Sequence, residues 1–280
     1  DINTVRSLLA KNGFTFKKSL GQNFLINPDV CPSMANAACD EKTGVLEIGP
    51  GFGVLTAELS RVARRVVAIE LDERLKKVLP ETLADCKNVE IIYGDALKLD
   101  LKALIKERFA DCERVAVCAN LPYYITSPVI MTLLESKLPI DSVTVMVQKE
   151  AAERLCAEVG TREAGAVSVA VSYYSKPEIL FTVDKDSFMP PPKVDSAVIR
   201  LKILEKAPIE VQDEKAFFRL VKCCFAQRRK TLVNTVSNTA GIEKERIKKA
   251  LNTLGISETA RSEQLTLAEL AELSNLLGGR

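Results

Sequence analysis

Three glycines at alternating positions, Gly49, Gly51 and Gly53, are the first residues whose type and spacing suggest chemistry. They follow an apolar run and precede a helix-like segment, so the backbone there can turn tightly and approach a bound nucleoside. The fingerprint of dinucleotide-binding proteins has its third glycine three residues after the second, where this chain has Val54. The pattern therefore predicts a nucleotide-type pocket of another kind. The alternative is a tight turn that binds no ligand.

Two acidic residues follow the next two apolar runs. Glu70 stands 19 residues after Gly51, where a carboxylate at the tip of a strand can accept hydrogen bonds from ribose hydroxyls. The alternative is an acid at a helix N-terminus, and Asp72 fits that alternative better than Glu70. Asp95 follows the third run, where it could accept a hydrogen bond from the exocyclic amine of an adenine or simply hold a turn.

The segment Asn120-Leu121-Pro122-Tyr123-Tyr124 directly follows another apolar run. An asparagine at the carboxyl end of a parallel strand lies where open α/β folds bind ligands, and the tyrosines offer flat faces for a base. The chain has no histidine. This excludes Ser-His-Asp and Cys-His sites, imidazole-bound zinc and an imidazole general base. The chemistry must therefore use carboxylates, amides, lysines, thiols, backbone groups or a cofactor.

Short apolar runs rich in β-branched residues must position these groups. They predict buried strands at 45–49, 66–70, 89–93, 115–120 and 143–148. The segments between them predict helices at 53–63, 72–83 and 126–135. This alternation indicates a parallel sheet with helices on both faces, an α/β fold.

The pattern changes along the second half of the chain. Residues 164–174 favour a helix over a strand, and strands are expected at 177–183 and 195–204, separated by a loop stiffened by three successive prolines. Beyond residue 205 only helices are predicted, at 213–226, 229–238, 243–254 and 265–276. We therefore expect one domain over 1–204, with an N-terminal flap at 1–28, and a helical domain over 205–280.

Composition predicts the cellular compartment of the protein and the chemical class of its partner. None of the 8 cysteines forms a CxxC pair, so reduced thiols in a cytoplasmic protein are expected. No apolar run approaches the ~18 residues of a membrane span. Residues 185–249 hold 15 Lys and Arg against 8 Asp and Glu, whereas the rest of the chain holds 24 against 29. This basic segment favours a phosphate-rich partner, although a solvated helical face is the alternative.

The glycine loop, the two acids and Asn-Leu-Pro-Tyr together resemble the class I methyltransferases that use S-adenosylmethionine. The resemblance extends over most of the chain to the ribosomal RNA adenine dimethyltransferases, the bacterial kasugamycin-resistance and eukaryotic Dim-type family. The motifs that carry it, in family order, are KKSLGQNFL (17–25), LEIGPGFGVLT (46–56), GDAL (94–97), NLPYYI (120–125), VQKEAAERL (147–155), FMPPPKVDSAVIRL (188–201) and FAQRRKTLVN (225–234).

The resemblance implies a Rossmann-like methyltransferase domain, a small all-helical C-terminal domain and, as substrate, the small-subunit (16S) rRNA of a 30S assembly intermediate. The implied reaction places two methyl groups on each N6 of two adjacent adenosines in a hairpin loop near the 3′ end of that RNA. S-adenosylmethionine would be the donor and S-adenosylhomocysteine the product, with no metal. A cytoplasmic monomer without membrane contact is expected. One departure is Ala164, where the family usually has tyrosine.

The cofactor and catalytic residues rest on that resemblance, residue by residue, whereas the RNA contacts are expected from the basic segment. The expected cofactor residues are Gln22, Asn23, Leu25, Gly49, Gly51, Glu70, Leu71, Asp95, Ala96 and Asn120. The expected catalytic residues are Asn120, the Leu121 carbonyl, Tyr123 and Phe188, the last two stacking on the base. The alternative for Phe188 is a packing residue of the core. The expected RNA contacts are Arg228, Arg229, Lys230, Lys222 and Arg200. On a helix Arg228, Arg229 and Lys230 span more than half a turn, so at least one should be engaged within the protein.

Two alternatives stay open at this point. The chain could be of the related macrolide-resistance type, which methylates an adenine of large-subunit rRNA. It could also be a ribosome-assembly or RNA-binding factor whose catalysis is dispensable. The FMPPPKVDSAVIRL and QRRKTL segments argue against the first alternative, and intact Glu70 and Asn120 argue against the second.

Overall fold

The computed structural model of the chain describes residues 7, 10, 11, 13 and 23–278. The chain divides into two compact units. The first comprises Asp1–Ala152 and Glu178–Ile203, and the second comprises Glu153–Pro177 and Leu204–Arg280. Each unit is described by itself below.

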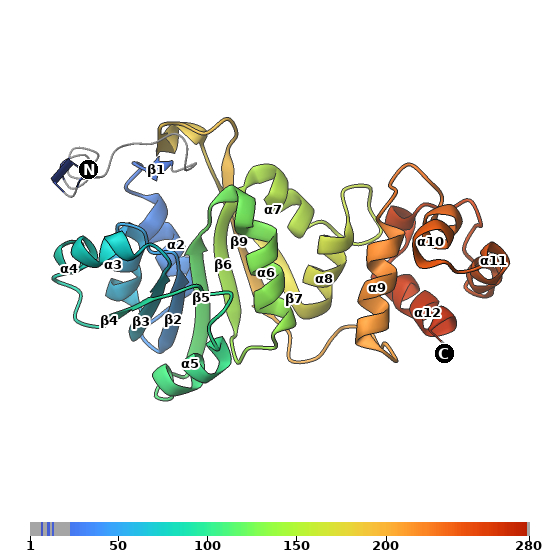
Figure 1. Cartoon of the computed structure of the whole chain (residues 1–280), viewed down its shortest axis with the longest axis horizontal. Coiled ribbons are helices and arrows are strands. Elements are labelled where there is room, and N and C mark those ends of the chain that lie inside the picture. Colours follow the sequence, from blue (N-terminus) through green and yellow to red (C-terminus); the bar gives the residue numbers. More distant parts are fainter. Residues whose placement is uncertain (1–6, 8–9, 12, 14–22, 279–280) are drawn as a thin grey trace. The chain divides into compact units, whose positions relative to one another are not determined.

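A seven-stranded sheet forms the centre of the first unit, in the order β4-β3-β2-β5-β6-β9-β7 (Figure 1). The strands are β2 (Thr43–Ile48), β3 (Arg65–Glu70), β4 (Val89–Tyr93), β5 (Arg114–Asn120), β6 (Ser142–Gln148), β7 (Ser175–Val183) and β9 (Ser196–Ile203). The first five of them pair in parallel, which confirms the expected α/β sheet. Strand β9 pairs antiparallel with β6.

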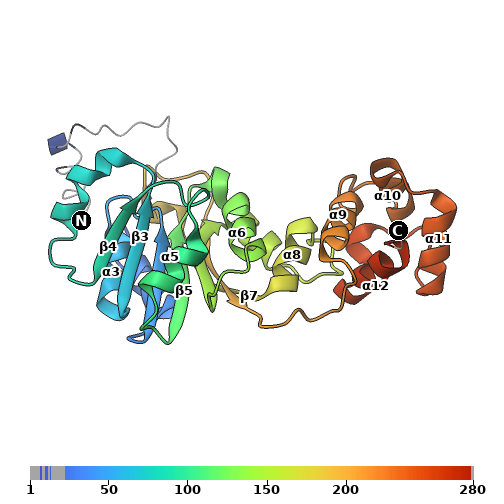
Figure 2. The ribbon, with the colours of Figure 1, turned by 60° about the horizontal axis from the view of Figure 1, so that its bottom comes forward.

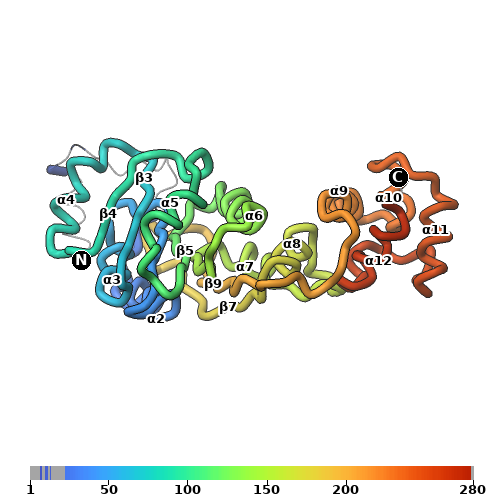
Figure 3. The backbone as a smooth tube through the Cα atoms, turned by 90° about the horizontal axis from the view of Figure 1, so that it is seen from below, coloured from blue at the N-terminus to red at the C-terminus, as the bar shows by residue number. Residues whose placement is uncertain are grey.

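Helices cover both faces of this sheet, as the apolar character of its strands requires. They are α2 (Val30–Ala38), α3 (Val54–Val62), α4 (Leu79–Thr82), α5 (Leu101–Arg108), α6 (Thr126–Glu135) and α7 (Lys149–Leu155), with short 3-10 helices η2 (Glu73–Lys77), η3 (Tyr123–Ile125) and η4 (Lys185–Ser187). All six residues of β2 are buried. Helices α2 and α6 lie on opposite sides of the sheet (Figure 3).

The single helix predicted over 72–83 is divided in two. Residues Glu73–Lys77 form η2, and Leu79–Thr82 form the one-turn helix α4, with Pro80 in its first turn. Proline has no backbone N–H, so it cannot continue a hydrogen-bond ladder from the preceding turn. A proline at the start of a helix is tolerated because the first N–H groups have no partner within the helix.

A second, two-stranded sheet consists of β1 (Phe24–Leu25) and β8 (Phe188–Met189), which pair antiparallel. It brings residues more than 160 positions apart into register, with Leu25 opposite Phe188. Strands of two residues carry no periodic pattern, which is why the sequence does not predict them.

Five helices dominate the second unit, and α9 to α12 gather in one group (Figure 2). They are α8 (Ala166–Tyr174), α9 (Glu214–Cys224), α10 (Leu232–Ala240), α11 (Lys244–Thr253) and α12 (Leu267–Leu277), with a 3-10 turn η5 (Ser262–Gln264). The helix favoured at 164–174 is therefore confirmed. The predicted division places 153–177 in the first domain, whereas these residues belong to the second unit.

Packing of α8 explains this difference. Val169 and Tyr173 of α8 share a buried core with Phe217 of α9. The hydroxyl of Tyr174 donates to Glu214 at 2.7 Å. Apolar burial and hydrogen bonding thus attach α8 to the C-terminal helices, although its sequence precedes two strands of the sheet. In the part of the chain that the structure describes, no helix is long and apolar enough to span a bilayer.

Candidate active site

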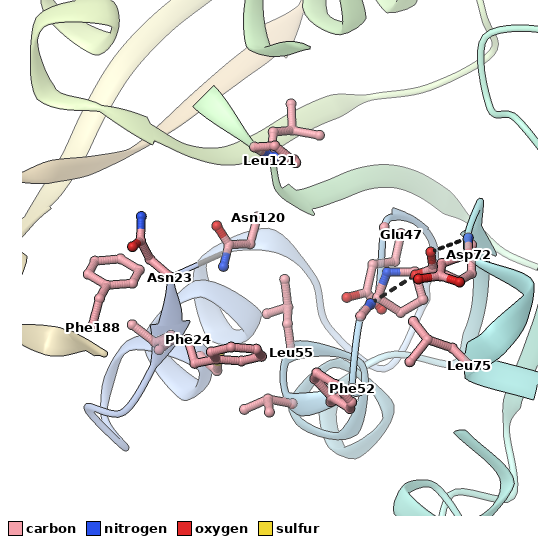
Figure 4. Close-up of a pocket in the computed structure, with 18 of the residues that line it drawn as sticks. Asn23, Phe24, Glu47, Phe52, Leu55, Asp72, Leu75, Asn120, Leu121 and Phe188 are labelled. Atoms are coloured by element: carbon pink, nitrogen blue, oxygen red, sulfur yellow. Dashed lines mark hydrogen bonds between the residues drawn. The ribbon is translucent and has the colours of Figure 1, made fainter. Parts of the chain in front are cut away.

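The strand order reverses between β2 and β5, because β3 and β4 lie on one side of β2 whereas β5 and β6 lie on the other. Ligands of open α/β sheets bind at the carboxyl ends of the strands at such a reversal. A cleft of about 300 Å³ opens there. Figure 4 shows Asn23, Asn120 and Phe188 toward one end of it, and Glu47 and Asp72 toward the other. The topology therefore gathers the motifs that the sequence singles out.

The glycine loop forms part of the cleft lining, through Gly49 and Gly51. Gly49, Gly51 and Gly53 have φ values of 71°, 56° and 85°, a left-handed backbone that side chains disfavour. A Cβ at Gly49 or Gly51 would meet no described atom within 4 Å, whereas one at Gly53 would lie 2.9 Å from Leu83. The first two glycines thus leave space beside the cleft, and the third allows close packing against α4.

Glu70 connects the glycine loop to the end of β3. Its side chain is 6% exposed; Oε2 accepts a hydrogen bond from Gly51 N–H at 3.0 Å, and Oε1 accepts one from Asp72 N–H at 2.8 Å. Burial raises the pKa of Glu70, and the two N–H donors oppose the rise. A carboxylate has about four acceptor positions, so capacity remains for ribose hydroxyls. Asp72 caps η2 through Arg74 N–H, as its sequence position favours.

Glu47 is a cleft residue that the sequence motifs do not single out. It is 1% exposed, lines the cleft and, among the described residues, its Oε2 has no hydrogen-bond partner. Burial raises its pKa to about 8, and the Glu70 carboxylate adds to the rise. In the sequence, Glu47 is a lone acid within an apolar run, two residues before Gly49.

Asn120 ends β5 and lines the cleft with Leu121, Pro122 and Tyr123. The backbone after Asn120 leaves the sheet at Pro122 and enters η3. The hydroxyl of Tyr123 lies 3.0 Å from Ser196 Oγ on β9. This hydrogen bond and the fixed φ of proline hold the tyrosine ring at the cleft.

The small sheet and the residue before it supply another part of the cleft lining, from Asn23, Leu25 and Phe188. Phe188 is 4% exposed and belongs to a buried core cluster that includes Met34 and Leu55. It therefore has both a packing role and access to the cleft. Gln22 lies outside the described residues.

Three expected cofactor residues, among those described, lie outside the cleft lining. Leu71 follows Glu70 and is 70% exposed. Asp95 follows β4; its Oδ1 accepts from Leu97 N–H at 3.0 Å, and its Oδ2 lies 3.7 Å from Lys98 Nζ. Ala96 is half-buried beside it. Asp95 thus holds a turn, as its alternative interpretation requires, and one of its oxygens also faces a lysine.

Four of the expected RNA residues are exposed and belong to the second unit, namely Lys222, Arg228, Arg229 and Lys230. The helix predicted to begin at 229 begins instead at Leu232, capped by Thr231, so Arg228, Arg229 and Lys230 lie in a turn. Arg228 donates to the carbonyl of Ala164 at 2.9 Å. The expectation that one of the three is engaged within the protein is therefore confirmed, although the helical geometry behind it is wrong.

The fifth residue, Arg200, belongs to the first unit. Its guanidinium donates to Glu178 Oε2 at 2.9 Å and to the Ala37 carbonyl at 3.2 Å. Two partners within the protein thus compete with any phosphate for this side chain. Ala164, where the family usually has tyrosine, is fully buried, and its carbonyl provides the acceptor for Arg228.

Comparison with known proteins extends over nearly the whole chain. A family described as ribosomal RNA adenine dimethylase matches residues 13–278. A ribosomal RNA small subunit methyltransferase A of Geobacillus thermodenitrificans is 50% identical over 97% of this chain and 94% of its own length. A protein of the same description from Bacillus licheniformis is 46% identical over 97% of this chain and 94% of its own.

Solved structures agree with this comparison. A dimethyladenosine transferase from Plasmodium falciparum superposes with a TM-score of 0.72 at 27% identity, covering 89% of this chain and 95% of its own. The 23S rRNA methyltransferase ErmE superposes with a TM-score of 0.69 at 27% identity, covering 91% of this chain and 100% of its own. The fold is thus that of the Rossmann-like methyltransferases, and the chain belongs to the ribosomal RNA adenine dimethylase family.

Proposed function

We propose that this chain transfers methyl groups from S-adenosylmethionine to N6 of two adjacent adenosines near the 3′ end of small-subunit rRNA, two groups to each. The observation that carries this proposal is the position of Asn120. It ends β5 at the reversal of strand order and shares one cleft with the glycine loop and Glu70. The small-subunit relatives, 50% and 46% identical to this chain, support the choice of RNA.

The cleft suits an adenosyl cofactor. Gly49 and Gly51 leave space where side chains would project, Glu70 retains acceptor capacity for ribose hydroxyls, and the unpartnered oxygen of Glu47 is a buried acceptor for a positive group. We propose that these residues hold the donor together with Gln22, Asn23, Leu25, Leu71, Asp95 and Ala96. The donor supplies an electrophilic methyl group on a sulfonium and leaves as S-adenosylhomocysteine. No metal is required.

Asn120 would activate the acceptor. The lone pair of an adenine N6 is delocalised into the ring, which makes the amine a poor nucleophile. The side-chain oxygen of Asn120 accepts a hydrogen bond from one N6–H, and the Leu121 carbonyl accepts the other. Both dipoles gain strength as positive charge develops on nitrogen in a site with little water. The alkylated amine is acidic and loses its proton readily, so the absence of histidine from the chain is no obstacle.

Tyr123 and Phe188 would hold the base. Both line the cleft, and an adenine drawn out of its loop gains stacking energy between two aromatic rings. The hydrogen bond between Tyr123 and Ser196 and the core packing of Phe188 hold the two rings at the cleft.

The RNA surface would lie on the second unit, which carries Lys222, Arg228, Arg229 and Lys230. Arg200 is the weakest of the proposed contacts, because Glu178 and Ala37 already engage it. We further propose that the protein acts as a cytoplasmic monomer on a late 30S assembly intermediate. The alternative is a ribosome-assembly factor that binds RNA through the same surface and does not depend on catalysis.

Methyl transfer to each subunit tests the proposal. Undermethylated small subunits and, separately, large subunits are incubated with the protein and S-adenosylmethionine labelled on its methyl group. Label in small-subunit RNA, as N6,N6-dimethyladenosine, is the expected result. Label in large-subunit RNA alone would instead support the activity for which ErmE is named. Tight RNA binding without label in either subunit would support the assembly factor.

A further inference from the structure

The two-stranded sheet β1–β8 joins opposite parts of the proposed site. Strand β1 belongs to the N-terminal segment, from which Asn23 and Leu25 line the cleft, and β8 carries Phe188. Leu25 and Phe188 are paired residues of this sheet. The segment proposed to contact the methyl donor and the ring proposed to stack on the target base are therefore neighbours in one hydrogen-bonded element.

Hydrogen bonds beyond the sheet strengthen this connection at Ser187. Its carbonyl accepts from the N–H groups of Ile26 at 2.8 Å and Asn27 at 3.3 Å. Its hydroxyl, in a side chain that is 8% exposed, accepts from Asn27 Nδ2 at 3.2 Å. The N-terminal segment thus cannot shift without also shifting the residue before Phe188 or breaking these bonds.

Strand β1 also contacts the glycine loop. The rings of Phe24 and Phe52 lie with their centroids 5.6 Å apart, and both residues line the cleft. The close-up shows Phe24 between Phe188 and Phe52 (Figure 4). One short strand therefore has contacts toward both the donor loop and the base-stacking ring.

The small sheet is weakly supported by backbone hydrogen bonds of its own. Each strand has two residues, and the sheet is separate from the seven-stranded one. A two-stranded ladder is marginal in water even when it is longer. Its order therefore depends also on contacts beyond the ladder, such as those of Ser187 with Ile26 and Asn27 and of Phe24 with Phe52.

We propose that the β1–β8 sheet couples the donor and RNA sites, so that each ligand raises the affinity for the other, with Ser187 as a positioning residue. The inference rests on the proposed function and adds cooperativity to it. Ordering the sheet costs conformational entropy. Once one ligand has ordered the sheet, the second ligand binds with a smaller entropy loss, and the effect on affinity is necessarily reciprocal.

Equilibrium dialysis of labelled S-adenosylhomocysteine tests the coupling. Its affinity is measured with and without saturating undermethylated small subunits. For the unmodified protein we expect about 10-fold tighter binding with subunits, within the ~5–150-fold range of such couplings. Ser187→Ala should reduce this ratio to below ~3-fold while changing the affinity without subunits by less than ~2-fold. Ser187→Thr, which keeps the hydroxyl, should restore the ratio.

Ser60→Ala is the matched control. It removes a part-buried hydroxyl of α3 that bonds Ala57 and Cys86 and should leave the ratio unchanged. Independent binding of the two ligands to the unmodified protein would overturn the inference and leave the proposed function intact. An unchanged ratio in Ser187→Ala would overturn the assignment to this sheet. Failure of S-adenosylhomocysteine to bind at all would refute the proposed function, and the inference with it.

Amide hydrogen exchange of the unmodified protein provides a second test of the coupling. The amides of Ile26 and Asn27 donate to Ser187, so their exchange reports on this connection directly. S-adenosylhomocysteine alone should slow their exchange, because it orders β1 against β8. Unchanged exchange at both amides, with the ligand bound, would contradict the inference.

Discussion

Glu47 shows how a single residue ties the stability of the fold to the chemistry of the cleft. The carboxyl group is fully buried, and its pKa is raised from 4.5 to about 8. In the ligand-free protein at neutral pH it is therefore mostly protonated and neutral. A positive group of the methyl donor would favour its ionised form.

Glu47→Gln should flatten part of the dependence of stability on pH. Between pH 4.5 and 8 the residue is ionised when the chain is unfolded and protonated when it is folded. Unfolding thus releases a proton, and the free energy of unfolding falls as pH rises, by roughly 4–5 kcal/mol in all. Glutamine does not ionise, so the variant lacks this pH-dependent contribution to the free energy of unfolding. The Tm of the variant, relative to that of the unmodified protein, should rise from pH 5 to pH 8.5. Parallel curves would contradict the assignment.

Phe188 allows packing and stacking to be separated. Phe188→Leu keeps most of the core volume but removes the ring, so cofactor affinity should change less than ~3-fold. The KM for small subunits should rise about 5- to 100-fold, since base stacking contributes roughly 1–3 kcal/mol. Phe109→Leu, at a residue that is 3% exposed at the end of α5, is the control for reduced packing. Equal RNA kinetics in the two variants would exclude stacking.

At the scale of elements, the sequence predicted what depends on local pattern. Strands β2 to β6 and the glycine loop follow from apolar runs and residue type. The turn at Arg228–Lys230 could not be predicted in this way, because arginine and lysine are good helix formers. Only the cap at Thr231 marks the true start of α10. The pairing of β1 with β8 depends on contacts between distant residues, as does the burial of Glu47. The pairing has no local signal, whereas a lone acid within the apolar run 45–49 is the local signal for Glu47.

Two glycines of one loop should respond differently to the same change. Gly53→Ala brings a methyl group about 2.9 Å from Leu83 and should cost roughly 1–3 kcal/mol of stability beyond the left-handed strain. Gly51→Ala meets no described atom within 4 Å and lines the cleft, so it should weaken S-adenosylhomocysteine binding more than it lowers Tm. Chemical denaturation and equilibrium binding distinguish the two. The reverse pattern would contradict the roles given to the loop.

At the scale of the whole molecule, a small net charge conceals an uneven distribution. The chain carries a formal charge of +2, with the basic excess between residues 185 and 249. Within the described residues, Lys222, Arg229 and Lys230 form no ion pair in the structure, whereas Lys42 pairs with Glu113 at 3.4 Å. Exposed cations without internal partners suit a phosphate backbone.

Salt dependence should therefore locate the RNA surface. Replacing Lys222, Arg229 and Lys230 together by Ala should weaken binding to small subunits. It should also reduce the slope of log affinity against log salt by about 0.7–0.9 for each phosphate that the variant no longer neutralises. Lys42→Ala removes one exposed positive charge from the first unit and should leave the slope unchanged. An unaltered slope in the triple variant would place the phosphate-binding surface elsewhere.

Under the proposed function, a site without histidine transfers methyl groups by alignment and fixed dipoles at Asn120. The most direct test is the single-turnover rate of Asn120→Ala on undermethylated small subunits, compared with its affinity for S-adenosylhomocysteine. We predict that the rate falls by about 10²–10³-fold, the loss typical of one transition-state dipole, while the affinity changes less than ~5-fold. Equal losses in rate and affinity, or an unchanged rate, would contradict the account.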